Sequence, residues 1–210
     1  MIDPKLKHYI ETEIIPQYDR YDPAHQSAHV YQVIENSLLL AQDFDVDVNI
    51  VYTVAAYHDI GLRYGRFGHE TSSKYIVFDD LELRKFFSPQ EIQLIGEAVE
   101  DHRASIEYEP RSIYGKIVSE ADRDLDIGRI IDRTIRFIHE YYPQASYDYI
   151  LMDTYHYLKD KYGSDSDLKL WLNHPETLGQ LAQLRKELQD MTCFSQIFNE
   201  LYQSIRDGKK

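Results

Sequence analysis

The sequence predicts an all-α protein, and two observations support this fold class. Apolar residues recur at the three-to-four-residue spacing of an amphipathic helix in a series of segments along the chain. No segment shows a convincing alternation of apolar and polar residues, which would indicate a half-buried strand. The 210 residues are enough for one well-buried core, and 43 % hydrophobic with 28 % charged residues is ordinary for a globular protein. We therefore expect a helical bundle.

The first two helices are predicted from prolines and apolar spacing. A helix is expected from about Asp3 to Tyr18, with Pro4 in its first turn, where a proline is tolerated. Pro23 is expected to open a second helix that runs to about Gln42. The apolar residues of this second helix follow helical spacing and define one face: Val30, Val33, Ile34, Leu38 and Ala41.

The third helix is expected to begin at an N-cap, Asn49, and to end at Gly61. Two glycines in the segment 62–68 predict a loop after it. The Ser88-Pro89 pair and Pro110 punctuate the rest of the chain where helix boundaries are expected. The remaining helices are predicted at 69–79, 89–102, 112–126, 128–141, 146–161 and 175–206.

Composition argues against several classes of function. A formal net charge of −13 disfavours a general nucleic-acid-binding surface, because such a surface needs clustered Lys and Arg. No segment approaches the roughly 20 apolar residues of a membrane span, and the N-terminal segment lacks the apolar core of a signal peptide. The single Cys193 excludes an intramolecular disulfide framework. We therefore expect a cytoplasmic protein without a membrane partner and without general nucleic-acid binding.

The strongest functional signal is the adjacent pair His58-Asp59, which follows the apolar run VYTVAAY and precedes Gly61. Imidazole and carboxylate are natural ligands for a divalent metal. Neighbouring residues of an ideal helix point about 100° apart, so the pair can converge on one ion only at a fraying helix end. Taken alone, His58 could instead be a residue at the helix C-terminus that the helix dipole stabilises, without any metal.

Four further polar residues lie on or beside predicted helices, in the order His29, His69, His102 and Asp122. His29 flanks the apolar stripe of the second helix, and Asp122 flanks a stripe near residue 121. His69 opens one predicted helix and His102 ends another. Each residue alone is more often a hydrogen-bonded residue at the edge of a core than a ligand. Their order around the His-Asp pair favours a metal site.

Five segments of the chain resemble the successive motifs of the HD superfamily of metal-dependent phosphohydrolases: HQSAHVYQV, AAYHDIG, RFGHE, IGEAVEDHR and IVSEADRDLD. The resemblance extends over residues 21–128, roughly half of the chain. It implies an HD-domain-like helical bundle, to which the helices predicted at 146–161 and 175–206 add a C-terminal part. It also implies one divalent metal held by His29, His58, Asp59 and Asp122. In members with two metals, further histidines fill positions that correspond in order to His69 and His102.

The resemblance implies hydrolysis of a phosphate ester or a nucleotide by a metal-activated water. The candidate ions are Mn, Fe, Mg, Ni, Co and Zn, with one or two ions bound. The expected partner is a small phosphorylated molecule, and the expected catalytic residues are His58, Asp59 and Arg63. Arginine forms bidentate bonds to phosphate, and the candidate phosphate contacts are Arg63, Arg66, Lys116 and Arg123, with Arg103 as a further candidate.

Two alternative functions stay open at this point. The HD scaffold also occurs in di-iron oxygenases, which would need both His69 and His102 at the metal. It also occurs in metal-containing binding or sensory domains without turnover. For the domain organisation, we expect an HD-type metal-binding domain over 1–145 and a C-terminal helical extension over 146–210, packed on the same core.

Overall fold

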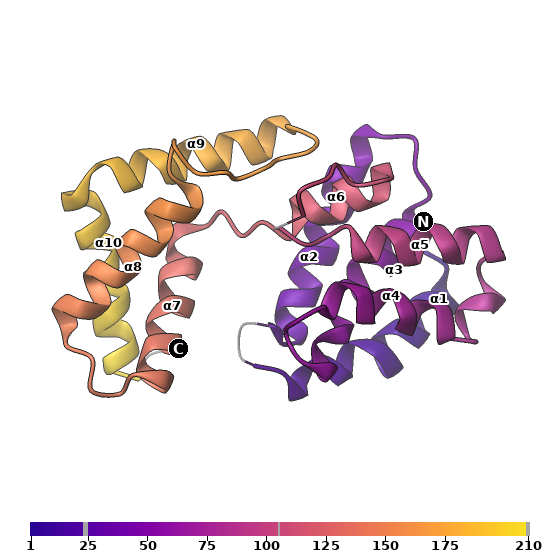
Figure 1. Cartoon of the computed structure of the whole chain (residues 1–210), viewed down its shortest axis with the longest axis horizontal. Helices are drawn as coiled ribbons and strands as arrows, with labels where there is room; N and C mark the ends of the chain where they lie inside the picture. The colour runs from indigo at the N-terminus through magenta and orange to yellow at the C-terminus, as the bar shows by residue number, and fades with distance from the viewer. Residues whose placement is uncertain (23–24, 105, 209–210) are drawn as a thin grey trace. The chain divides into compact units, whose positions relative to one another are not determined.

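The computed structural model describes residues 1–22, 25–104 and 106–208, and Figure 1 shows that the elements are helices joined by loops. No strand occurs among these described residues, so the all-α prediction is confirmed. The chain divides into two compact units, one of residues 1–123 with 170–172 and one of 124–169 with 173–210. The division expected between residues 145 and 146, with the extension on the same core, stays a prediction.

The first unit begins with a helical stretch that changes its pitch twice. Helix α1 (Pro4–Tyr9) continues as a π-helical segment at Ile10–Ile14 and as a 3₁₀ segment at Ile15–Arg20. The Asp3 side chain caps its start by accepting hydrogen bonds from two backbone N–H groups of the first turn. The other α-helices described in this unit are α2 (Ser27–Leu40), α3 (Val48–Tyr57), α4 (His69–Asp79), α5 (Pro89–Glu100) and α6 (Ile113–Ala121).

Two predicted helix starts differ from the structure or lie outside it. The start of the second helix at Pro23 lies outside the described residues, and α2 begins at Ser27. The predicted N-cap of the third helix at Asn49 is wrong. Asp47 caps α3 instead, because its Oδ1 accepts a hydrogen bond from the Asn49 backbone N–H at 2.7 Å. Asn49 uses its own side-chain oxygen to accept from the Asp3 backbone N–H.

Helix α3 is the centre of the first unit. Every residue from Ile50 to Tyr57 is buried, and the helix packs against α2, α5 and α6. A helix that is apolar on all sides must be enclosed by other helices to stay out of water. Because α3 is enclosed, the two residues that follow it, His58 and Asp59, also lie inside the unit, where their exposed fractions are 0 % and 5 %.

The second unit consists, in its described part, of α7 (Ile127–Tyr141), α8 (Tyr147–Tyr162), α9 (Pro175–Gln189) and α10 (Met191–Arg206). Phe194 and Phe198 of α10 are fully buried in its core. The predicted single helix over 175–206 is wrong. The chain leaves helical geometry at Asp190, whose carboxylate accepts the backbone N–H of Thr192 and Cys193 and thereby starts α10.

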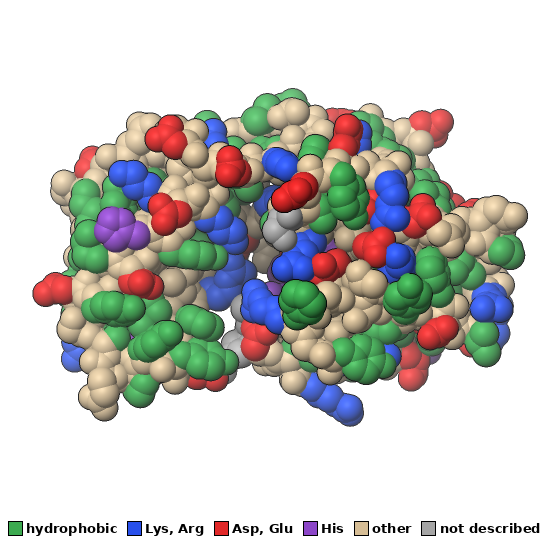
Figure 2. All heavy atoms as spheres, viewed as in Figure 1, with side chains coloured by type: hydrophobic (Ala, Val, Ile, Leu, Met, Phe, Trp, Pro, Cys, Tyr) green, Lys and Arg blue, Asp and Glu red, His purple; other side chains and the backbone are tan. Residues whose placement is uncertain are grey.

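Charged side chains are mixed over the visible surface of the first unit. Figure 2 shows acidic and basic groups interspersed on the face toward the viewer. Several charged residues of the first unit pair directly, such as Lys85 with Glu82 and Arg111 with Glu100. Most such pairs contribute little to stability, yet they neutralise charge locally. Among the described helices, none is both long enough and apolar enough to cross a membrane.

Candidate metal centre

The centre is built on the end of α3. His58 still has helical dihedral angles, whereas Asp59 has left them, with φ −110° and ψ 7°. This change of direction lets two adjacent side chains turn toward one point, which a continuous helix would forbid. The Nε2 atom of His58 lies 3.4 Å from Oδ2 of Asp59.

The first group of side chains around this pair comes from α2 and from the end of α6. Nε2 of His29 lies 3.3 Å from Nε2 of His58 and 3.2 Å from Oδ1 of Asp122. His58 Nε2 is 3.8 Å from the same Asp122 oxygen. Asp122 directly follows α6, which ends at Ala121 and not at residue 126 as predicted. These four side chains therefore meet, although they come from three separate parts of the sequence.

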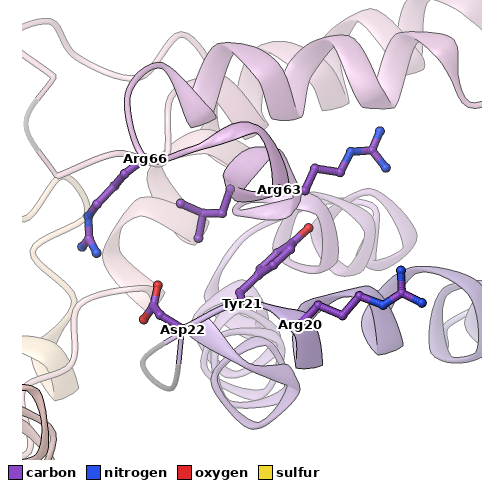
Figure 3. Close-up of a pocket in the computed structure, with 6 residues that line it drawn as sticks. Arg20, Tyr21, Asp22, Arg63 and Arg66 are labelled. Atoms are coloured by element: carbon purple, nitrogen blue, oxygen red, sulfur yellow. The ribbon is translucent and has the colours of Figure 1, made fainter. Parts of the chain in front are cut away.

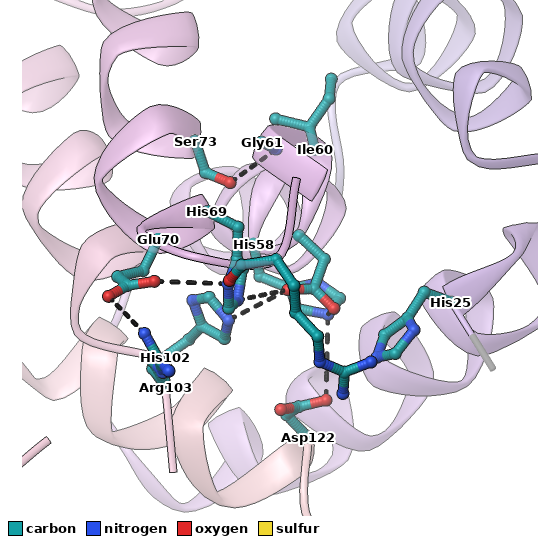
Figure 4. Close-up of polar contacts among 12 residues, drawn as sticks. His25, His58, Ile60, Gly61, His69, Glu70, Ser73, His102, Arg103 and Asp122 are labelled. Carbon is teal, nitrogen blue, oxygen red and sulfur yellow. Dashed lines mark hydrogen bonds and ion pairs between the residues drawn. The ribbon is translucent and has the colours of Figure 1, made fainter. Parts of the chain in front are cut away.

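A second group faces the other oxygen of Asp59. Nε2 of His69, at the start of α4, lies 3.0 Å from Asp59 Oδ1, and Nε2 of His102, just after α5, lies 3.3 Å from it. Figure 4 shows His58, His69, His102 and Asp122 directed toward a common centre. One carboxylate thus presents Oδ2 to the first group and Oδ1 to the second. Such an arrangement can bridge two cations.

Three of the histidines share a hydrogen-bond pattern that selects one tautomer. In each, Nδ1 lies within hydrogen-bond distance of the backbone carbonyl three residues earlier. A carbonyl oxygen only accepts, so Nδ1 must carry the proton, and Nε2 of the neutral ring keeps a lone pair for a metal. The pairs are His58 with Ala55 at 2.7 Å, His69 with Arg66 at 2.9 Å and His102 with Val99 at 2.6 Å.

The electrostatics of the centre favour positive charge between the rings and the carboxylates. Burial lowers the pKa of His58, but Asp59 and Asp122 outweigh burial and raise it to about 9. Burial raises the pKa of Asp59, but His58, His102 and His69 hold it well below its usual range. The pKa of His69 is raised because Asp59 outweighs its burial. Protons or a divalent cation can supply this positive charge, and the two compete for the same Nε2 atoms.

The donor set fits a divalent cation. Nε2 of His29 lies 3.3 Å from Nε2 of His58, so the two atoms can share one cation when both rings are neutral and carry their proton on Nδ1. Two sets of three ligands lie close enough to hold one ion each: His29 with His58 and Asp59, and Asp59 with His69 and His102.

The model of the HD domain family matches residues 27–125 of this chain. These residues form an HD domain. The match begins at the first residue of α2 and ends just after Asp122, so it contains every candidate ligand described above. HD domains are generally metal-dependent hydrolases. No curated protein and no solved structure matches the chain.

Backbone contacts hold the ligand-bearing turn of the HD domain in place. The Gly61 backbone N–H donates to Ser73 Oγ at 2.8 Å, and the Tyr21 hydroxyl donates to the Ile60 carbonyl at 2.8 Å. A Cβ on Gly61 would lie 2.2 Å from the backbone oxygen of His69. Sequence analysis assigned Gly61 only a role in ending a helix. That expectation is wrong, because α3 ends at Tyr57 and Gly61 lies in a 3₁₀ segment, Ile60–Tyr64; the missing side chain of Gly61 instead lets α4 approach the His-Asp turn.

The basic residues expected at the substrate phosphate lie in different places. Arg63 and Arg66 line one pocket beside the centre, which Figure 3 shows together with Arg20. Arg123 is buried, with Nη1 3.9 Å from Asp122 Oδ2 and Nη2 donating to Ser119 Oγ.

The other two basic candidates form ion pairs. Lys116 pairs with Glu109 and lines a different pocket, with Pro110 and Arg111 among its neighbours. Arg103 forms an ion pair with Glu70 at 2.7 Å. Arg63 and Arg66 thus line the same pocket, whereas Lys116 and Arg103 have acidic partners.

His25 is a neighbour of the centre that sequence analysis left without a role. Its ring meets the His29 ring edge-on, with centroids 5.9 Å apart, and its Nδ1 lies 2.9 Å from the Asp22 carboxylate. Burial, with a smaller contribution from the charge of Arg66, lowers the pKa of His25 against the opposing effect of Asp59 and Asp22. His25 precedes α2, so helical spacing from His29 does not account for this contact.

Proposed function

We propose that the protein is a metal-dependent phosphohydrolase that acts on a phosphate ester or a nucleotide. The observation that carries this proposal is the position of Asp59, whose two oxygens face two separate histidine groups. In this proposal one ion binds His29, His58, Asp59 and Asp122. A second ion, more weakly held, binds Asp59, His69 and His102.

The ligand chemistry favours some ions over others. Imidazole nitrogen suits Fe, Ni, Zn and Co, whereas Mg prefers carboxylate and water oxygens. Four histidine Nε2 atoms therefore favour the first set, and the carboxylates of Asp59 and Asp122 keep Mn possible. Two carboxylates also offset the charge of two divalent ions in part, which a wholly neutral ligand set would not do.

A bound divalent ion would lower the pKa of a water toward neutrality and would offset the charge of a phosphoryl group. The residues of the chain have their own tasks. Asp59 would help to hold the ion and would be placed to accept a hydrogen bond from the attacking water, and the backbone-bonded rings of His58 and His69 keep Nε2 directed inward. Arg63 and Arg66 bind substrate phosphate from the neighbouring pocket. Arg123 helps to hold Asp122 in position.

Phosphate release tests this proposal. Protein stripped with a chelator and reloaded with Mn²⁺, Co²⁺ or Ni²⁺ is assayed against p-nitrophenyl phosphate, bis-p-nitrophenyl phosphate, sugar phosphates and nucleotides. We expect release with a loaded metal, none after chelation, and a loss of about a hundredfold or more in Asp59→Asn. Loaded protein that releases phosphate from none of these compounds would refute the hydrolase proposal.

One observation favours a second candidate, a di-iron oxygenase. This function needs both His69 and His102 at the metal, and both Nε2 atoms lie within 3.3 Å of Asp59 Oδ1. Hydrolysis is the preferred proposal, because arginines beside the centre suit a charged phosphate more than an uncharged substrate. Protein loaded with Fe²⁺ and assayed for oxygen consumption separates the two. Substrate-dependent oxygen consumption without phosphate release would favour the oxygenase.

A further inference from the structure

A pocket with a volume of about 390 Å³ is lined by residues close in sequence to the candidate ligands Asp59 and His69, among them Leu62, Arg63 and Arg66. Its lining residues are joined to the ligand-bearing segments by short contacts. The Arg66 carbonyl accepts from His69 Nδ1 at 2.9 Å, and the Leu62 backbone N–H donates to the Asp59 carbonyl at 3.0 Å. Asp22, which also lines the pocket, contacts His25, whose ring lies beside that of His29. The turns that carry Asp59 and His69 thus also supply Leu62, Arg63 and Arg66 to the pocket.

The pocket is strongly cationic for a chain with a net charge of −13. Arg20, Arg63 and Arg66 line it, against one carboxylate, Asp22. The Asp22 carboxylate is already engaged by His25 Nδ1 at 2.9 Å. The guanidinium groups of Arg20 and Arg66 form no hydrogen bond or ion pair with any residue that the structure describes. This differs from Arg103 and Arg111, which pair with acids, and leaves the donors of Arg20 and Arg66 available to a ligand.

The three arginines form two ends of the pocket. Figure 3 shows the guanidinium groups of Arg20 and Arg63 on one side of Tyr21, and that of Arg66 on the other side, toward Asp22. Arg63 is steadied by a hydrogen bond to Gln17 Oε1 at 3.3 Å and by the ring of Tyr64, 4.8 Å from its guanidinium carbon. One ligand that contacts both cationic ends would offer an anionic group to each.

We propose that the substrate carries a second anionic group, a phosphate or a carboxylate, that Arg20 and Arg63 bind while the phosphoryl group to be cleaved lies at the metal centre beside Arg66. This inference rests on the proposed phosphohydrolase function and narrows its substrate class. Phosphate monoesters with a distal phosphate or carboxylate belong to this class. Simple monoesters without a second charge do not.

Binding of inert phosphonates tests the subsite without turnover. Alkyl phosphonates with three to six methylene groups are compared with the α,ω-bisphosphonates and the ω-carboxyalkyl phosphonates of the same lengths, by calorimetry on Mn²⁺-loaded protein. We expect the best-fitting doubly anionic compound to bind about tenfold or more tightly than its singly anionic counterpart. The carboxylate and bisphosphonate series show which second group is preferred.

Two variants test whether Arg20 causes the preference for doubly anionic phosphonates. Arg20→Ala should reduce the preference to about twofold or less, while the affinity for the simple phosphonate stays within about twofold. Arg84→Ala, which removes an exposed arginine elsewhere in the same unit, should keep the full preference. Because both variants carry the same metal centre, chelation of the ion by the second group cannot imitate this result.

Each outcome distinguishes the two proposals. A loaded protein that shows no preference at any length, or an Arg20→Ala variant that keeps it, overturns the subsite even when phosphate is released from p-nitrophenyl phosphate. A preference that Arg20→Ala removes, in a protein that releases phosphate from no compound, supports the subsite and refutes the hydrolase. Absence of phosphonate binding in every series counts against both.

Discussion

At the scale of single residues, Asp59 is the residue that connects the two groups of candidate ligands. Its two oxygens face His58 on one side and His69 with His102 on the other. Asp122 completes only the first group, within 3.8 Å of two histidine Nε2 atoms. Substitutions at these two carboxylates should therefore differ, since loss of Asp59 affects both groups and loss of Asp122 affects one.

Asp122→Ala should weaken binding of the first metal ion by at least about a hundredfold, because it removes a carboxylate ligand and its charge. Metal content after dialysis, measured by mass spectrometry, checks this. Asp45→Ala is the matched control, because Asp45 is an exposed aspartate of the same unit. Full metal occupancy in Asp122→Ala would exclude this residue as a ligand.

The buried His58 predicts that two properties change with pH in opposite directions. As the pH rises, the metal-free protein should lose stability and the affinity for metal should increase. In the metal-free protein its pKa is raised from 6.5 to about 9, so the protonated ring stabilises the folded state below about pH 6.5. That stabilisation should be lost as the pH rises to about 9, by about 1–3 kcal/mol in the free energy of unfolding. Urea denaturation of chelator-treated protein across this range measures it.

Metal affinity should rise over the same pH range, since the ion competes with the proton on His58 Nε2. Calorimetric titration with Zn²⁺ or Co²⁺ at several pH values should also detect proton release on binding. An affinity that is independent of pH between 6.5 and 9 would show that His58 binds no proton that the metal must displace.

At the scale of structural elements, the centre depends on how closely α4 approaches the end of α3. Gly61 and Ser73 make this contact, with the Gly61 N–H donating to Ser73 Oγ at 2.8 Å. His69 is the first residue of α4, so any shift of that helix moves a candidate ligand. The capped start of α3 at Asp47 and its enclosed course fix the other side of this contact.

Gly61→Ala should therefore destabilise the protein and weaken the second metal group more than the first. A Cβ there would lie 2.2 Å from the His69 oxygen and 2.6 Å from the Ser73 nitrogen, which forces α4 away. The expected loss is about 1–3 kcal/mol in unfolding free energy. Gly179→Ala in α9 is the matched control, since a Cβ there meets no atom within 4 Å, and it should be neutral or slightly stabilising. Equal stability of the two variants would contradict this account.

At the scale of the whole molecule, all six candidate ligands lie in the first unit, and α7 to α10 lie in the second. Metal binding stabilises only structure that is lost when the site opens. Hydrogen exchange of the full chain, with and without Zn²⁺ or Co²⁺, should therefore show added protection in α3 and at the ends of α4, α5 and α6. Slow-exchanging amides of α10 should change less. Equal added protection in α10 would show that the two units unfold as one.

The helices and the order of the candidate ligands could be read from the sequence, because helical periodicity is a local property. The N-cap of α3 could not, since both Asp47 and Asn49 are suitable capping residues and the structure uses Asp47. Periodicity does not place a break such as Asp190, where one side chain that accepts backbone N–H groups outweighs a continuous apolar pattern. The motifs also indicated His29, His58, Asp59 and Asp122, since the resemblance preserves their order along the chain.

Packing alone decided which of these atoms meet. The assignment of each Asp59 oxygen to one histidine group depends on where α4 and α5 end against α3. Likewise, Lys116 meets Glu109, and Arg20 joins Arg63 at one pocket, although 43 residues separate those two arginines in the sequence. Such contacts depend on the directions of whole helices. Residue spacing determines the face of a helix on which a side chain lies, but not which helix that face will meet.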